Sequence, residues 1–447
     1  MNGSLSIRRK SCRRRSMDSA AKRTDNTILL RIILFACIAA VFIYPSSSIV
    51  LGTVVAALLV FLYFARNDTV LVTVFIVVAN DALGTMILGK VSFQYLLILF
   101  VLYELFAQKQ IRVRIFAAVF LLLAIAAQPL VTGIIGTKAL IFTSLYIVSL
   151  ALQFEKYKDD RELFISKFTE AFSIIVFLIA LHAAITGGVV YKEVQNTQYH
   201  YEYQRTGVLG VGIGDPNFSS LLLCTGIACT VINKSFKLLL KLMFIAVMIF
   251  AMFGTASTSG FLALILISLL IVSINENATK TVKRILFIVL GFVVIYNIYI
   301  LLPENYHISD LDFYIERFTS KIEALFVGNY HDVTSGRSDI SDQYFNYINN
   351  EQSVWRMFLG GNSIMAEFDM APHNTYIDFI LQFGYVGLAV IVATVIHRVY
   401  KVYKTYEFAN YRKLSIVLKF LYAFFAFTLS VYTGSTFAVM MFVFFIL

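Results

Sequence analysis

The sequence predicts an all-α polytopic membrane protein of about 14 transmembrane helices, with 12 as the lower bound. Hydrophobic residues make up 59% of the chain and charged residues 14%, far from the balance of a soluble domain. Apolar runs of about 20 residues, the length that crosses a hydrocarbon core, recur along the whole chain. The runs are continuous rather than alternating, and only helices or closed barrels satisfy their own backbone in lipid, so we expect helices.

The predicted spans form a long first group and a short second group, separated by a polar stretch. In order, they are 28–44, 49–65, 69–88, 91–107, 113–129, 136–153, 168–189, 216–233, 237–254, 258–274 and 284–302, and then 373–397, 414–431 and 433–447. Several are short for a full crossing. The pair 113–129 and 136–153, or the last pair, are also compatible with re-entrant or merged segments, which accounts for the lower bound.

Four regions follow from this pattern. They are a basic cytoplasmic tail (1–27), a transmembrane bundle (28–302) with an outer loop at 190–215, a long extracytoplasmic loop (303–372) and C-terminal transmembrane helices (373–447). Helical periodicity in the long loop predicts two short helices over the mouth of the bundle. Their apolar faces comprise Phe313, Phe318, Ile322 and Leu325, and then Ile340, Tyr344 and Tyr347.

Basic residues orient the chain, because short loops rich in Lys and Arg stay in the cytoplasm. With both termini cytoplasmic, 29 of the 37 Lys and Arg residues fall on the inner side. The net charge of +10 therefore points to anionic membrane lipid rather than nucleic acid. The basic stretch SIRRKSCRRRS lacks a small-residue cleavage site after it, so we expect 28–44 to be a retained anchor, although Met17 is an alternative start. The four cysteines show no metal-type spacing.

Polar residues concentrate in the two outer loops and at the ends of the spans beside them. The first loop contains RTGVLGVGIGDPN, in which Asp215 and Pro216 predict the start of a helix. The second contains ERF and SGRSDI, and it closes with HNTYIDFILQFGYVGL. These stretches, in this order and spacing over residues 200–400, resemble the O-antigen ligase and Wzy-type polysaccharide polymerase superfamily.

The resemblance implies a GT-C-like glycosyltransferase of the bacterial inner membrane, acting without metal or other cofactor at the extracytoplasmic face. Its substrates would be oligosaccharides on undecaprenyl pyrophosphate, and a chain-length regulator is a possible protein partner. The arginines of the family's loops fall on Arg205 and Arg337, and its loop-end histidine falls on His373. The chain departs from the family at STSGFLAL (257–264), where many members have an arginine after the serine.

The chemistry suits these residue types. Cleavage of a sugar C1–pyrophosphate bond leaves negative charge on phosphate, which a planar guanidinium can bind through two oxygens without a metal. The acceptor hydroxyl must lose a proton, and a histidine serves as base at neutral pH, although His373 could instead bind phosphate. Other candidate bases are Asp339, Glu367 and Asp369. Candidate substrate-binding residues are Arg317, Asn217, Asn374 and Asp339.

Each assignment has a structural alternative. Arg317 is better explained as a solvated or salt-bridged residue, whereas for His373 the functional role is favoured over that of an interfacial or helix-capping residue. The pair Asp310 and Asp312 resembles an acidic metal ligand set or a helix start, and we expect no metal there. For the whole protein, we expect a polymerase that joins carrier-linked repeat units. The alternatives are a ligase that moves finished glycan to another acceptor and, in a different class, a transporter or flippase of lipid-linked oligosaccharide.

Overall fold

The computed structural model describes most of the predicted bundle. Described residues are 30, 33–37, 48–83, 93–107, 137–186, 189–193, 203–207, 215–274, 316, 319–321, 323–324, 326–329, 337–351, 353–361, 372–405, 409–430 and 434–447. The predicted spans 113–129 and 284–302, most of 28–44, and the apolar face from Phe313 to Leu325 lie outside them. Arg317, Asp310, Asp312, Glu367 and Asp369 lie outside them as well.

Helices occupy the predicted spans that the structure describes, so the helical class is confirmed there. The first group is α2 (Ser48–Ala65), α3 (Thr69–Leu83), the 3-10 turn η2 (Phe93–Tyr95), α4 (Leu96–Ala107), α6 (Thr137–Lys156), α7 (Arg161–Thr186), α8 (Pro216–Ile232), α9 (Leu238–Thr255) and α10 (Thr258–Ser273). The last group is α16 (Thr375–Thr405), α17 (Ala409–Ala426) and α18 (Gly434–Met441), which continues as the π-helix η6 (Phe442–Ile446).

Three of the described helices are long and apolar enough to cross a membrane, judged by length and composition: Arg161–Thr186, Leu238–Thr255 and Thr375–Lys404. Others are apolar but shorter, among them Pro216–Ile232 and Thr258–Ser273. Large apolar side chains such as Leu239, Phe250 and Ile396 are exposed on these helices, as expected of surfaces that face lipid. The chain is therefore of the helical membrane class, while the number of 12 to 14 spans stays a prediction.

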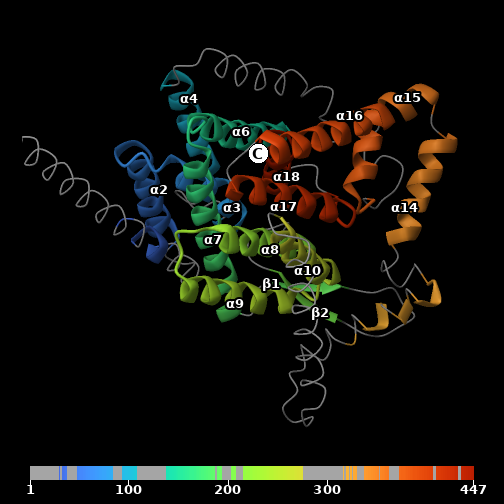
Figure 1. The fold of residues 1–447 in the computed structure, drawn as a ribbon, viewed down its shortest axis with the longest axis horizontal. Helices are drawn as coiled ribbons and strands as arrows, with labels where there is room; N and C mark the ends of the chain where they lie inside the picture. The colour runs from blue at the N-terminus through green and yellow to red at the C-terminus, as the bar shows by residue number, and fades with distance from the viewer. Residues whose placement is uncertain are drawn as a thin grey trace, which may run out of the picture.

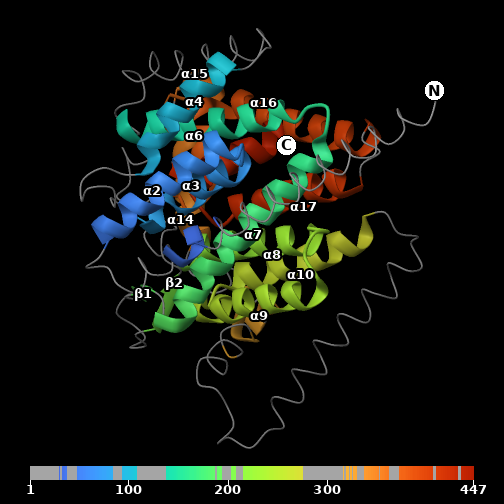
Figure 2. The ribbon, with the colours of Figure 1, turned by 90° about the vertical axis from the view of Figure 1, so that its left-hand side faces the viewer.

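The helices pack as two groups around α17. Helices α8, α9 and α10 lie together on one side of α17, and α6 and α16 lie on the other, as Figures 1 and 2 both show. Helix α7 crosses between α3 and the α8–α9 pair and contacts all three. The main core runs through these helices and includes fully buried Phe168, Phe172 and Phe425.

Contacts between helix ends join loops that the charge pattern places on the same side. On the predicted cytoplasmic side, the pairs are Glu104–Lys156, Glu162–Asn410 and Ser166–Asn233. On the predicted outer side, the pairs are Asn217–Ser257, Arg337–Thr428 and Thr375–Leu429. The two sets of loops therefore gather at separate ends of the described helices. Which end faces the cytoplasm stays a prediction.

The expectation of an all-α chain needs one correction. Two antiparallel strands, β1 (Val189–Glu193) and β2 (Tyr203–Gly207), occupy the predicted outer loop 190–215. Tyr191 lies opposite Arg205 in the register. Strand β1 begins with Val-Val-Tyr, residue types that favour extended backbone, but the pairing depends on a distant segment that no local period signals. Strand β2 packs against α8 and α9.

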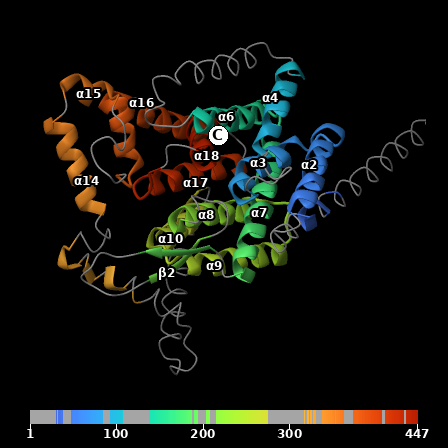
Figure 3. The same ribbon diagram turned by 180° about the vertical axis from the view of Figure 1, so that it is seen from behind.

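Helix α16 is broken rather than continuous. Gly384 has φ 67° and ψ 178°, a conformation that glycine alone adopts readily. A Cβ atom at this position would lie 2.0 Å from the carbonyl oxygen of Phe358 in the short helix α15 (Val354–Leu359). Figures 1 and 3 show the two limbs of α16 running in different directions, with α15 at the bend. The predicted span 373–397 is therefore divided, and the second limb, 385–405, is roughly 30 Å long and alone has the length of a span.

The long loop carries a helix that packs on the first limb of α16. Helix α14 (Arg337–Asn346) leads into the π-helix η5 (Tyr347–Glu351). Ile340, Tyr344 and Tyr347 share a small apolar core with Ile377 and Ile380 of α16. The predicted apolar face of this helix is confirmed, and it covers α16 rather than lying free on a membrane surface.

Candidate functional site

The start of α16 is attached to the end of α17. Asn374 caps α16, because its Oδ1 accepts hydrogen bonds from the backbone N–H groups of Tyr376 (3.0 Å) and Ile377 (3.4 Å). The Thr375 hydroxyl donates to the carbonyl of Leu429 at 2.5 Å, and the Tyr376 hydroxyl donates to the carbonyl of Ala423 at 2.9 Å. The sequence HNTY thus fixes the first turn of α16 on α17.

His373 immediately precedes this cap and is exposed. Its φ of 50° is in the left-handed region, where histidine is enriched relative to most residues other than glycine but still unusual. Such conformations persist where the surrounding structure holds them, and they are frequent at functional sites. His373 is therefore a fixed, accessible imidazole at the start of α16.

Arg337 reaches the same end of α17 from the long loop. It begins α14, is partly buried, and donates from Nη1 to the carbonyl of Thr428 at 2.9 Å. Thr428 precedes Leu429, the residue that accepts from Thr375. Two segments that are distant in sequence therefore attach to consecutive carbonyls, and two of the predicted residues, Arg337 and His373, belong to one locality.

A buried carboxylate lies one helical turn below the cap. Asp378 is 0% exposed, and neither carboxylate oxygen makes a hydrogen bond of standard geometry with a described residue. The Ser430 hydroxyl, just beyond α17, is nevertheless close enough to act on the carboxylate as a hydrogen-bond donor. Tyr344 of α14 lies near enough to be affected by its charge: burial, and then the Asp378 carboxylate, raise the pKa of Tyr344 to about 12. Gln382, one turn further along α16, has a buried Nε2 with no partner in the described chain.

Asp378 is not among the residues that the sequence pattern singled out. The bases expected besides His373 were Asp339, Glu367 and Asp369, because they lie in the polar loop. The structure places Asp339 on the exposed side of α14, where it accepts a hydrogen bond from Ser338 Oγ at 3.2 Å. The signal for Asp378 was available in the sequence: it is an ionisable residue inside a predicted span, and such residues are expensive and usually functional.

The remaining predicted residues lie elsewhere or outside the described chain. Asn217 is buried in the first turn of α8, where its Oδ1 accepts a hydrogen bond from Ser257 Oγ at 2.9 Å. Asp215 caps this helix and Pro216 is its first residue, as predicted. Asn217 thus joins α8 to α10, and its role in substrate binding stays a prediction. Arg205 lies on β2, and its side chain is outside the described part.

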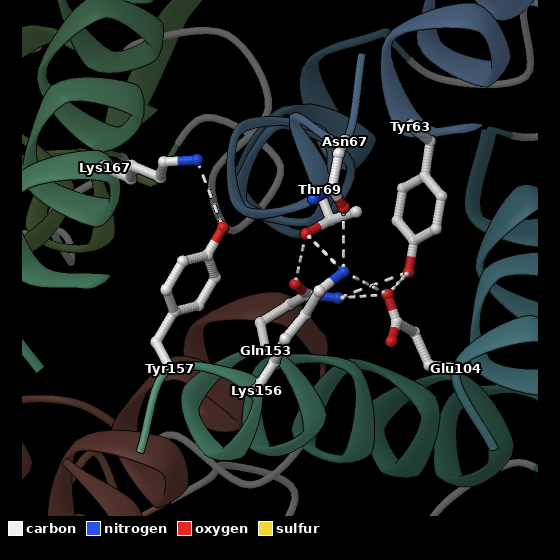
Figure 4. A network of polar contacts seen from close by, with 8 residues as sticks. All are labelled: Tyr63, Asn67, Thr69, Glu104, Gln153, Lys156, Tyr157 and Lys167. Carbon is white, nitrogen blue, oxygen red and sulfur yellow. Dashed lines mark hydrogen bonds and ion pairs between the residues drawn. The ribbon is translucent and has the colours of Figure 1, made fainter. Parts of the chain in front are cut away.

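A second polar cluster lies at the other end of the bundle (Figure 4). Glu104 accepts hydrogen bonds from the Tyr63 hydroxyl and from Lys156 Nζ, both at 3.0 Å. Gln153 Nε2 donates to the Tyr63 hydroxyl at 3.2 Å, while Gln153 Oε1 accepts from Thr69 at 2.6 Å. These five residues come from α2, α3, α4 and α6. Because donors and acceptors are paired within the cluster, we assign it to holding these helices together.

The described residues include no group of three His, Cys, Asp or Glu side chains arranged to hold a metal ion. What the first cluster offers is a guanidinium, an imidazole and a buried carboxylate close to one helix end. This set can bind an anion at its exposed edge and accept a proton at its buried edge.

The fold and this cluster define a helical membrane protein with a polar site at one end of its bundle. Comparison with protein-family models, with curated proteins and with solved structures gives no match. The function is therefore argued from the site alone.

Proposed function

We propose that the chain is a polysaccharide polymerase of the bacterial inner membrane. It would join repeat units carried on undecaprenyl pyrophosphate by glycosyl transfer at the extracytoplasmic face, without a metal. The observation that carries the proposal is that Arg337 and the first turn of α16, which His373 precedes, attach to consecutive carbonyls after α17, near the buried Asp378. A chain-length regulator is a protein partner compatible with this activity.

The donor pyrophosphate would bind at the exposed edge of the site. Departure of the carrier pyrophosphate places negative charge on the phosphate next to the sugar C1. Arg337 is partly buried and stays protonated at any working pH, so it can stabilise this charge more strongly than a fully solvated cation. The bond to Thr428 uses one of the five guanidinium N–H donors and fixes the position of the group.

A ligase would use the same donor and the same leaving group. The difference lies in the acceptor, which would be another lipid or a protein instead of a carrier-linked repeat. No described residue discriminates between these acceptors, so the ligase remains the alternative within the class.

A transporter of lipid-linked oligosaccharide is the candidate from a different class, and two observations favour it. Broken helices with ionisable groups inside the membrane are typical of transporters, and α16 is broken at Gly384. Lys419 on α17 is 1% exposed and donates to Ser415 Oγ at 2.6 Å, so α17 also carries a buried ionisable group. The clustering of polar groups at one helix end, rather than at mid-bundle, favours the enzyme.

The glycan that accumulates on undecaprenyl pyrophosphate in cells lacking the protein separates the three candidates. Single repeats that accumulate on the outer face indicate a polymerase, and complete polymers there indicate a ligase. Single repeats held on the cytoplasmic face indicate a flippase and would overturn the proposal. As a control, wild-type protein supplied to these cells should restore the normal glycan. Arg337→Ala at the same membrane level should not, which would link the accumulated glycan to this protein.

A further inference from the structure

Asp378 is an ionisable side chain in a buried setting. It is 0% exposed, and its neighbours Ile377 and Phe379 are also buried, at 0% and 2% exposed. Neither carboxylate oxygen makes a hydrogen bond of standard geometry with a described residue, and the nearby Ser430 hydroxyl is the one donor that acts on it within the described chain. Its position in the first turn of α16 brings it near the positive end of the helix dipole.

The dipole does not offset the cost of burial. A helix N-terminus stabilises a carboxylate only modestly. Burial of a carboxyl group away from water costs more than this, whether the group stays ionised or takes up a proton. Since stability alone would favour an apolar residue here, the carboxylate is better explained by its chemistry.

The groups around Asp378 suit a hydroxyl-bearing ligand. Gln382 supplies a buried amide nitrogen from the next turn of α16, with no hydrogen-bond partner in the described chain. Ser430 supplies a buried hydroxyl from the segment after α17, close to the carboxylate. Tyr344 faces the carboxylate from α14. A sugar hydroxyl can donate to the carboxylate and accept from the amide, and so satisfies both.

The site is shallow. Asp378 lies four residues beyond the cap Asn374, which corresponds to roughly 6 Å along the helix axis. The exposed His373 immediately precedes the cap Asn374. Arg337 donates to the carbonyl of Thr428, two residues before Ser430. An acceptor hydroxyl that reaches the carboxylate therefore arrives within about one helical turn of the proposed pyrophosphate site.

We propose that Asp378, rather than His373, receives the proton of the acceptor hydroxyl. The inference rests on the proposed glycosyl transfer. The acceptor oxygen forms a bond to the donor sugar C1 as the C1–O bond to pyrophosphate breaks. The bonding pair leaves with undecaprenyl pyrophosphate, and the hydroxyl proton passes to the Asp378 carboxylate and then to water. His373, at the exposed edge, contacts phosphate.

The test uses the full chain in bilayer nanodiscs with undecaprenyl-pyrophosphate-linked repeat units as donor and acceptor. We expect Asp378→Asn to bind the lipid-linked repeat within about twofold of wild type and to polymerise at least 100-fold more slowly, the lower end of the range for a lost general base. Asp342→Asn makes the same chemical change at an exposed position on α14 and should leave both quantities unchanged.

Polymerisation by Asp378→Asn within threefold of wild type, or loss of repeat binding in this variant, would overturn the assignment. If Asp378→Asn does not accumulate as folded protein, the test uses Asp378→Glu instead. If Asp378 is the base, the acid limb of the pH–rate profile should move in this variant. An acid limb that stays in place would reject Asp378 as the base. A wild-type protein that binds repeats but never joins them would instead refute the proposed polymerase, which separates the two failures.

Discussion

Removing the Arg337 side chain should have two effects of different size. The bond from Nη1 to the Thr428 carbonyl, 2.9 Å long, attaches the start of α14 to the end of α17. A hydrogen bond that involves a charged group contributes about 1.5–3 kcal/mol, so Arg337→Ala should weaken the docking of α14 by that order. In the proposed reaction Arg337 also stabilises the leaving pyrophosphate. A charge pair at about 4 Å and an effective dielectric near 20 contributes on the order of 4 kcal/mol.

The second contribution corresponds to roughly a thousandfold in rate. Arg337→Gln removes the charge and places its N–H two bonds short of the position of Nη1, so it loses the bond to Thr428 as Arg337→Ala does but keeps more of the side chain. If Arg337 only attaches α14, the polymerisation rate of Arg337→Gln should fall no further than the loss of α14 docking explains. If it binds pyrophosphate, Arg337→Gln should be nearly as slow as Arg337→Ala, and Arg337→Lys should recover only part of the rate because an ammonium cannot hold two oxygens in a plane.

The assay is the initial rate of chain growth from lipid-linked repeats, normalised to folded protein in nanodiscs. Docking of α14 is followed separately by the protease sensitivity of the long loop. Near-normal rates for a well-folded Arg337→Gln would refute the pyrophosphate role. They would leave Arg337 as an attachment for α14 and move the search to Arg205 and Arg317.

Four further outcomes are expected. Gly384→Ala should lower the thermal midpoint and the activity together, because the added Cβ atom would lie 2.0 Å from the carbonyl oxygen of Phe358. An unchanged thermal midpoint would contradict the break in α16. Glu104→Ala removes the carboxylate that accepts from Tyr63 and Lys156 and should cost about 1–3 kcal/mol of stability, which would show as a lower thermal midpoint; an unchanged midpoint would show that the cluster does not hold the helices together. A single cysteine at exposed Asp342 should react with an impermeant thiol reagent in intact cells, and labelling only after permeabilisation would reverse the topology. Polymerisation should survive EDTA; loss of activity that magnesium or manganese restores would return a metal to the mechanism.

Local signals in the sequence were sufficient for the helices and their starts. Asp215 and Pro216 predicted the start of α8, and the structure has the carboxylate cap and the proline where expected. The apolar face of α14 was predicted from Ile340, Tyr344 and Tyr347. These features depend on hydropathy and capping within one or two turns, which the sequence displays directly.

The site was predicted only in part. Arg337 and His373 were chosen through a family resemblance, and the attachment of Arg337 and of Thr375, two residues after His373, to consecutive carbonyls after α17 was not visible in either segment. Asp378 was passed over, because it stands in an apolar run whose hydropathy it hardly changes. The hairpin of β1 and β2 was also missed, since its strands depend on each other and not on a local period.

Composition and hydropathy thus determined the class, because the free energy of transferring a side chain from water to an apolar phase is a property of each residue and adds along a segment. Only the tertiary structure decided which segments meet. The break at Gly384 accompanies the close approach of α15, and the buried Asp378 lies near Tyr344 and Ser430, which come from two other segments. Contacts of this kind depend on the packing of distant surfaces, which no window of the sequence contains.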